Sequence, residues 1–171
     1  DDKDAYVPAP TGLNFIFGSW GGANAIASKP LNANGTTNSP TAETTIIASG
    51  VSESDSEDGS SCEGAYVISK PVNPDDSEAG MYYYLYVSYG QNTGTYTERV
   101  FRSTSPNSGF VDLDDVSSTN TSNVMKGHQI IGPFDLSNYK YMFISTGHNS
   151  VYKTVNNFGE VVSIHSTHAR P

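Results

Sequence analysis

The sequence predicts an all-β protein, and three observations support that prediction. Short apolar runs rich in Val, Ile, Tyr and Phe recur along the 171 residues, and each is bounded by Gly, Pro, Asn or Asp. Turn signals return about every 8–12 residues, which is the spacing seen in sandwiches, barrels and propellers. In addition, no window of useful length carries apolar residues at the period of an amphipathic helix.

The N-terminal third combines short apolar runs with long polar stretches. Residues 13–20, LNFIFGSW, predict a buried strand that runs into a tight turn, and residues 24–28 predict its hairpin partner. TTIIAS at residues 44–49 is a further apolar run among small polar residues. The acidic stretch 49–61 lacks the alternating Asp-x-Asp-x-Asp frame of an EF-hand, so we interpret it as a solvated loop.

The middle of the chain predicts three consecutive strands. Residues 65–70 and 81–90 form a predicted hairpin, because residues 71–80 between them are rich in Pro, Asn, Asp and Gly. Residues 96–105, YTERVFRSTS, predict the third strand. Alternation along the tyrosine-rich strand predicts one face with Tyr82, Tyr84, Tyr86 and Ser88, and an opposite face with Tyr83, Leu85, Val87 and Tyr89.

The C-terminal third predicts further strands at residues 128–134 and 139–146. Residues 150–155 and 160–167 predict a last hairpin around an Asn-Asn-Phe-Gly turn. No linker and no break in composition separate these segments, so we expect a single domain over residues 1–171.

Composition and charge exclude several classes of function. A formal net charge of -9 and the lack of a Lys and Arg cluster argue against nucleic acids and anionic membranes as partners. No apolar run reaches the roughly 18 residues that a membrane span requires. The first residues lack the basic start and apolar centre of a signal peptide, so we expect any such signal to lie outside this chain. Two glycosylation sequons, at Asn34 and Asn120, are compatible with a secreted, extracellular protein.

The Cys and His residues offer few catalytic or metal-binding combinations. Cys62 is the single cysteine, which excludes an internal disulfide, and we favour a buried residue over a nucleophile. His165 and His168 are three residues apart in a predicted strand and therefore face opposite sides, which is poor geometry for a shared zinc ion. His128 has no partner nearby in the sequence, and we interpret it as structural.

Several motifs follow one another in an order that is typical of one enzyme family. They are FGSWGG at 17–22, CEGAYVI at 62–68, YYYLYVSYG at 82–90, YTERVFRSTSPNSGFVD at 96–112, STGHNSVY at 145–152 and HSTHARP at 165–171. Together they resemble glycoside hydrolase family 43, and most of all its arabinanase-like branch. The resemblance covers roughly residues 4–171, with residues 23–61 matching poorly. It implies a five-bladed β-propeller that cleaves arabinan, xylan or a related polysaccharide. It also implies that the tyrosine-rich run is an inner strand of its blade.

The resemblance assigns roles to named residues. Glu63, in Glu-Gly-Ala, matches the family's general acid, whose pKa is raised by burial and by a neighbouring carboxylate. Asp4 matches the Asp that tunes this acid, with Asp1 or Asp2 as alternatives. The family's general base is an Asp of the first blade, and the resemblance places it ahead of this chain. An inverting hydrolase holds its two carboxyl groups about 6.5–9.5 Å apart.

Three further residues match positions that contact sugar or metal in the family. Trp20 would stack on a sugar ring, although core burial is an equal alternative. Arg99 would reach substrate hydroxyls or a carboxylate. His148, in Gly-His-Asn-Ser, would face a central calcium or its waters, with a structural turn residue as the alternative.

The chain length sets a limit on the propeller. At about 40–45 residues per blade, 171 residues supply about three and a half to four of five blades. We therefore expect a propeller that is incomplete at its N-terminus, or one that another chain or copy completes.

Three functions remain open at this point. The first is an inverting hydrolase of α-L-arabinan or a related plant polysaccharide, with an oligosaccharide or polysaccharide as partner. The second is a non-catalytic carbohydrate-binding propeller that has lost its base. The third is an extracellular assembly subunit whose open blade edges pair between chains.

Overall fold

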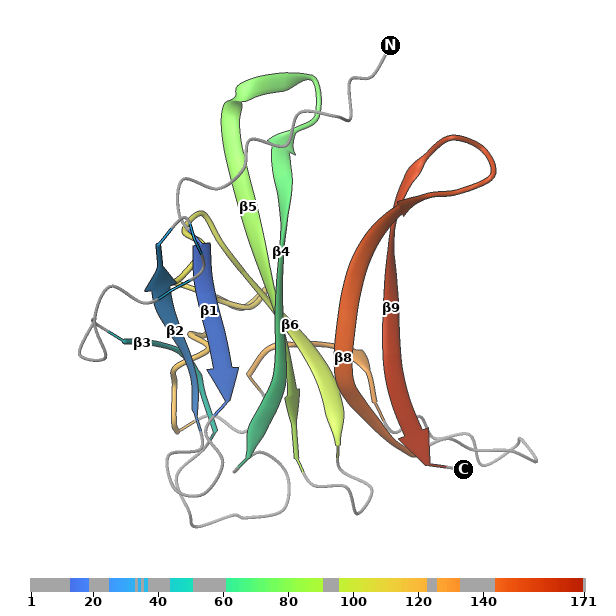
Figure 1. Cartoon of the computed structure of the whole chain (residues 1–171). Helices are drawn as coiled ribbons and strands as arrows, with labels where there is room; N and C mark the ends of the chain where they lie inside the picture. The colour runs from blue at the N-terminus through green and yellow to red at the C-terminus, as the bar shows by residue number, and fades with distance from the viewer. Residues whose placement is uncertain are drawn as a thin grey trace.

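Nine β-strands in three antiparallel sheets make up the part of the chain that the computed structural model describes, and this part contains no helix (Figure 1). The described residues are 13–18, 25–32, 34, 36, 44–50, 61–90, 96–122, 126–132 and 144–170. The strands are β1 (Leu13–Gly18), β2 (Ala25–Leu31), β3 (Thr45–Ser49), β4 (Cys62–Asn73), β5 (Asp76–Tyr89), β6 (Thr97–Ser103), β7 (His128–Ile131), β8 (Ile144–Val155) and β9 (Val161–Arg170). Within these residues, nothing helical is long and apolar enough to cross a membrane.

The first sheet has the order β1-β2-β3 and confirms the predicted N-terminal hairpin. β1 and β2 pair antiparallel from Leu13 opposite Leu31 to Gly18 opposite Ile26. β3 pairs with the other edge of β2, and its Ile47 is 1% exposed. The sheet thereby turns an apolar side toward the core.

The second sheet has the order β4-β5-β6-β7, so the tyrosine-rich β5 is an inner strand as predicted. The connection between β4 and β5 is much shorter than the ten-residue turn that the sequence suggested. It consists of a turn at residues 74–75, and the ladder continues to Asn73 opposite Asp76. The side-chain oxygen of Asn73 accepts a hydrogen bond from the backbone N–H of Asp75 at 3.1 Å, which closes an Asx turn. Because this bond confines the turn to two residues, the remaining Pro, Asn, Asp and Gly residues of the predicted turn lie in the two strands.

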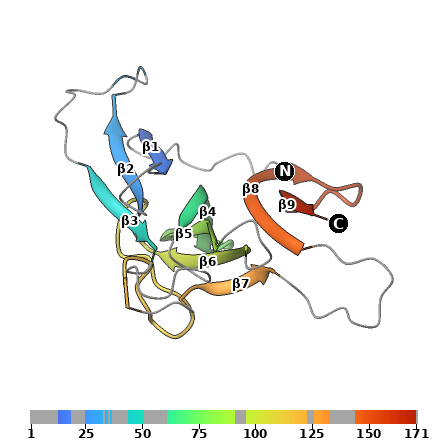
Figure 2. The same ribbon diagram turned by 90° about the horizontal axis from the view of Figure 1, so that it is seen from below.

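The two faces of β5 pack against different sheets, which confirms the predicted alternation. Leu85, Val87 and Tyr89 lie in the larger core cluster, together with side chains of the first sheet such as Ile26. Tyr86 lies in a second cluster on the opposite face, together with Ile68 and Val151. Figures 1 and 2 accordingly show β4–β6 between β1–β3 on one side and β8–β9 on the other. This radial stacking of sheets is the arrangement of a β-propeller.

The third sheet is the predicted C-terminal hairpin of β8 and β9. β8 begins at Ile144, so residues 144–146 belong to it rather than to the separate strand predicted at 139–146. Its turn is closed by Asn156, whose side-chain oxygen accepts hydrogen bonds from the N–H groups of Phe158 and Glu160 at 2.9 and 3.0 Å. The register of the pair shifts on both sides of Gly147, so β8 carries an irregular, bulged segment there. The bulge lies beside Glu63 and Gly64 at the start of β4.

The described part of the chain contains one complete blade and parts of two others. A propeller blade is a four-stranded sheet, and the three sheets here have three, four and two strands. The all-β propeller is therefore confirmed as a partial one. The prediction of about three and a half to four blades included residues that lie outside the described segments.

Gly147 is required by the close packing at the bulge. A Cβ atom at this position would lie 2.4 Å from Cε1 of Tyr96 and 2.9 Å from Oγ of Ser88. We expect Gly147→Ala to lower the free energy of unfolding by about 1–3 kcal/mol, because an overpacked site must shift its neighbours. Urea denaturation measures the change. Gly18→Ala is the control, since its Cβ would meet Ile26 at an ordinary 3.5 Å, and equal stability of the two variants would contradict the packing argument.

Candidate active site

Glu63 lies at the start of β4, where β4 comes close to β8. Its side chain is 49% exposed, whereas the preceding Cys62 is buried, as predicted. Gly64 follows in the left-handed region with φ of 61°, and a Cβ atom there would lie 2.8 Å from Cα of His148. The glycine therefore allows the backbone of β8 to approach, and this brings His148 beside Glu63.

Two side chains approach the same oxygen of Glu63. The hydroxyl of Tyr96 donates a hydrogen bond to Oε1 at 2.7 Å, and Nδ1 of His148 lies 3.7 Å from that atom. Tyr96 is only 3% exposed. Burial and then the hydrogen bond to Glu63 hold the pKa of the Tyr96 hydroxyl well above its usual value, so it stays a neutral donor. Neither contact involves Oε2.

Three aromatic rings stack beside the carboxylate. The ring of Tyr96 lies 5.8 Å from that of His168 at an interplanar angle of 7°, and His168 lies 5.8 Å from His148 at 25°. The outer members, Tyr96 and His148, are the two groups that approach Glu63. The stack therefore forms one wall of the site.

The bulge of β8 sets the direction of His148. The residue has φ of 52°, in the left-handed region that few non-glycine residues adopt. Its backbone N–H donates to Oγ of the buried Ser88 at 2.7 Å, and the hydroxyl of Thr167 donates to the carbonyl of Gly147 at 2.6 Å. Such a conformation persists only when its surroundings hold it, and it is enriched at functional sites.

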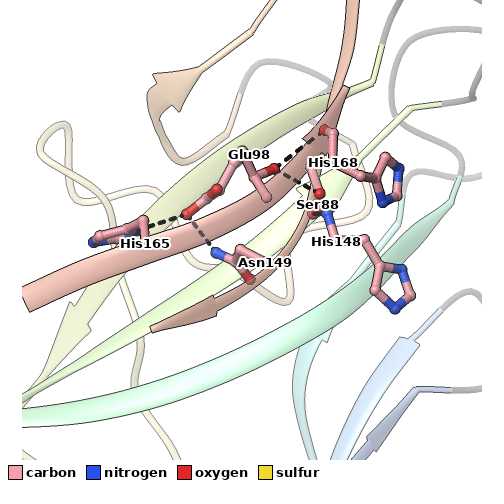
Figure 3. Close-up of polar contacts among 8 residues, drawn as sticks. Ser88, Glu98, His148, Asn149, His165 and His168 are labelled. Atoms are coloured by element: carbon pink, nitrogen blue, oxygen red, sulfur yellow. Dashed lines mark hydrogen bonds and ion pairs between the residues drawn. The ribbon is translucent and has the colours of Figure 1, made fainter. Parts of the chain in front are cut away.

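A second polar cluster lies deeper and is centred on Glu98, which is fully buried. Its Oε1 accepts a hydrogen bond from the amide of Asn149 and lies 3.2 Å from Nδ1 of His165. Figure 3 shows His165 and Asn149 pointing toward Glu98, while the rings of His148 and His168 point away from it. The two faces of β9 thus serve separate clusters, which confirms the prediction that His165 and His168 face opposite sides.

The sequence analysis did not single out Glu98, although the alternation of residues along β6 indicates that it is buried. Alternation places it on the same face of β6 as Val100, which packs against the second core cluster. A carboxylate on such a face requires partners. These come from Asn149 of β8 and His165 of β9, which are far away in the sequence.

Arg99 is placed in a structural role by its described contacts. It is 6% exposed, and its Nη1 donates to the carbonyls of Lys126 and Gly127 at 3.3 and 3.2 Å. Its Nε donates to Thr97 at 3.2 Å. Contact between Arg99 and a substrate stays a prediction. Asp4 and Trp20 lie outside the described residues, so their predicted roles also stay predictions.

The described residues do not form a calcium site by themselves. Calcium takes about six to eight oxygen ligands, whereas the neighbourhood of His148 offers imidazole rings and the carboxylate of Glu63. Among the residues with described positions, no group of three or more His, Cys, Asp or Glu could hold a metal ion. The contact of His148 with calcium therefore stays a prediction.

Similar solved structures are arabinanases and related hydrolases. The endo-1,5-α-L-arabinanase of Thermotoga petrophila RKU-1 is 27% identical, covers 96% of this chain and is itself covered to 37%, with a TM-score of 0.62. The family 43 YxiA protein of Bacillus licheniformis is 22% identical, with coverages of 96% and 36% and a TM-score of 0.62. This chain has the fold of glycoside hydrolase family 43. The α-L-arabinanase of Cellvibrio cellulosa, solved with arabinohexaose, is 23% identical, with coverages of 92% and 44% and a TM-score of 0.60.

The family 43 fold is present here in part. The chain spans between about a third and a half of the length of these solved structures, at 37%, 44% and 36%. No family model matches the sequence, and no curated protein matches it significantly. The likeness therefore concerns the fold.

Cys62 next to Glu63 should be unreactive in the folded protein. Burial raises the pKa of its thiol from 9.0 to about 11, so the nucleophilic thiolate is scarce at pH 8. We expect Ellman's reagent to label the protein at pH 8 only after denaturation. Between pH 9.0 and about 11 the unfolded thiol loses a proton that the folded one keeps, so the free energy of unfolding falls. Cys62→Ala should weaken this decrease of the free energy of unfolding with pH. Rapid labelling of the folded protein by Ellman's reagent would contradict the burial of the thiol.

Proposed function

We propose that this protein is an inverting glycoside hydrolase of α-L-arabinan or a related plant polysaccharide, with Glu63 as the general acid. One observation carries the proposal. In a family 43 fold, the half-exposed carboxylate of Glu63 is held through Oε1 by the buried hydroxyl of Tyr96. A general acid needs this combination of a fixed carboxyl group and an oxygen that substrate can reach.

The substrate class is proposed from the structural neighbours. Two of them are named as arabinanases, and one was solved with arabinohexaose. An oligosaccharide of this kind would place its glycosidic oxygen at Oε2 of Glu63, which donates the proton as the bond to the anomeric carbon breaks. A water molecule, activated by a second carboxylate, attacks the opposite face of the sugar.

The remaining roles in the proposed site fall to residues both inside and outside the described segments. Asp4 would tune and orient Glu63, and Trp20 would stack on a sugar ring. Arg99 would contact substrate, and His148 would face a calcium ion. The base would be an Asp of a further blade. Another segment or another chain would complete the ring, and secretion would bring the enzyme to its polysaccharide.

Replacing the acid tests the proposal. Glu63→Gln keeps the shape of the side chain but cannot donate the proton, and general acid–base catalysis contributes about 10²–10⁴-fold in rate. We expect hydrolysis of debranched arabinan to fall by that factor, measured as the release of reducing ends. Glu78→Gln, in the exposed hairpin of β4 and β5, is the matched control and should keep full activity.

Binding separates the proposal from its alternative. Isothermal titration with arabinohexaose should show similar affinity for the wild-type protein and for Glu63→Gln. Undiminished hydrolysis by Glu63→Gln would refute the assignment of the acid. A wild-type protein that binds arabinohexaose without cleaving it would instead be a carbohydrate-binding propeller.

A further inference from the structure

We propose that Tyr96 is a positioning residue for Glu63. The Tyr96 hydroxyl donates a hydrogen bond to Oε1 of Glu63, so that the transferable proton is carried on Oε2 of Glu63. This inference rests on the proposed function of Glu63 as the acid. A protonated carboxyl group has one O–H donor and keeps acceptor capacity on its other oxygen. An oxygen that already accepts a hydrogen bond from a donor is the worse site for the proton. Tyr96 would thereby direct the proton toward the side open to substrate.

The geometry of Tyr96 suits this role. Its hydroxyl lies 2.7 Å from Oε1, a short and direct hydrogen bond. His148 approaches the same atom but remains 3.7 Å away, which is too far for a hydrogen bond. Tyr96 is therefore the direct partner of Oε1 among the described side chains.

Packing holds the ring of Tyr96 in one orientation. Gly147 lies against one part of the ring, so closely that a Cβ atom there would be 2.4 Å from Cε1. His168 stacks on the ring nearly parallel, at an interplanar angle of 7°. With 3% of its surface exposed, the side chain has little freedom to rotate. A rigid donor fixes the carboxyl group more effectively than a mobile one, since less conformational entropy is lost in the bond.

Tyr96 also remains a donor at every working pH. Burial, followed by the bond to Glu63, raises the pKa of its hydroxyl well above the usual value. The charged and titratable groups that face the contact are Glu63 itself, His148 of β8 and His168 of β9. A tyrosinate that accepted the proton from Glu63 is thus not expected.

A comparison of leaving groups tests the positioning role. In Tyr96→Phe the ring and its stack stay, and only the hydroxyl is lost. We expect kcat on arabino-oligosaccharides to fall about tenfold or more, as part of the roughly 10²–10⁴-fold that a general acid contributes. A 4-nitrophenyl arabinofuranoside, whose leaving group departs without a proton, should be hydrolysed at nearly the wild-type rate. Equal losses on both substrates would overturn the proposal, because a merely structural role affects both alike.

Tyr89→Phe is the matched control. Tyr89 ends β5 and is 1% exposed, and its hydroxyl has no hydrogen-bond partner among the described residues. Both variants remove one buried hydroxyl, at the end of β5 and at the residue before β6, and thermal unfolding compares their stabilities. We expect Tyr89→Phe to leave both activities unchanged, so a loss as large as that of Tyr96→Phe would also overturn the proposal.

Carboxyl NMR provides a readout that does not depend on activity. The ¹³C resonance of the Glu63 carboxyl group is identified by its absence in Glu63→Gln. It should move in Tyr96→Phe and stay in place in Tyr89→Phe. An unchanged resonance in Tyr96→Phe would overturn the proposal. If the resonance moves but the wild-type protein cleaves neither substrate, the contact is supported and the hydrolase function is what fails.

Discussion

The close approach of the bulged segment of β8 to β4 and β5 is the constraint on which the site depends. Two glycines permit it, because a Cβ atom at Gly64 or Gly147 would overlap with the facing strand or ring. At this crossing His148 adopts a left-handed backbone, and its N–H binds Ser88 of β5. The same crossing brings an imidazole to Glu63 and confines the ring of Tyr96. Several contacts of the proposed acid therefore depend on the packing of β8 against β4 and β5.

The buried cluster around Glu98 also holds β8 and β9 against β6. The carboxylate accepts from Asn149 of the bulge and contacts His165 of β9, so it joins β6 to both strands of the last sheet. Its second oxygen and the side-chain oxygen of Asn149 have no hydrogen-bond partner in the described part of the chain. Removing one member of such a buried group costs about 1–3 kcal/mol, because a polar atom that it bonded is left without a partner. The cluster thus fixes the orientation of the sheets more than it adds net stability.

Local patterns predicted the strands well, since alternation and turn residues act over a few positions. The inner position of β5, its two faces and the C-terminal hairpin were all correct. The extended hairpin of β4 and β5 was not, because the Asx turn at Asn73 confines the reversal to residues 74–75. Glu63 was selected through its flanking motif, and its role as the acid stays a prediction. Tyr96 and Glu98 were missed because their partners lie 33 and at least 51 residues away, where periodicity carries no information.

The exposure of Glu63 indicates what the rest of the site must supply. A carboxyl group that is 49% exposed still faces water on one side. General acids work best in surroundings that exclude water, where electrostatic interactions are stronger than in bulk solvent. Tyr96 and His148 approach Oε1, and neither of them contacts Oε2. Under the proposed function, the missing cover would come from other segments of the propeller or from a bound polysaccharide, and a sugar lying over Oε2 would exclude water where the proton is transferred.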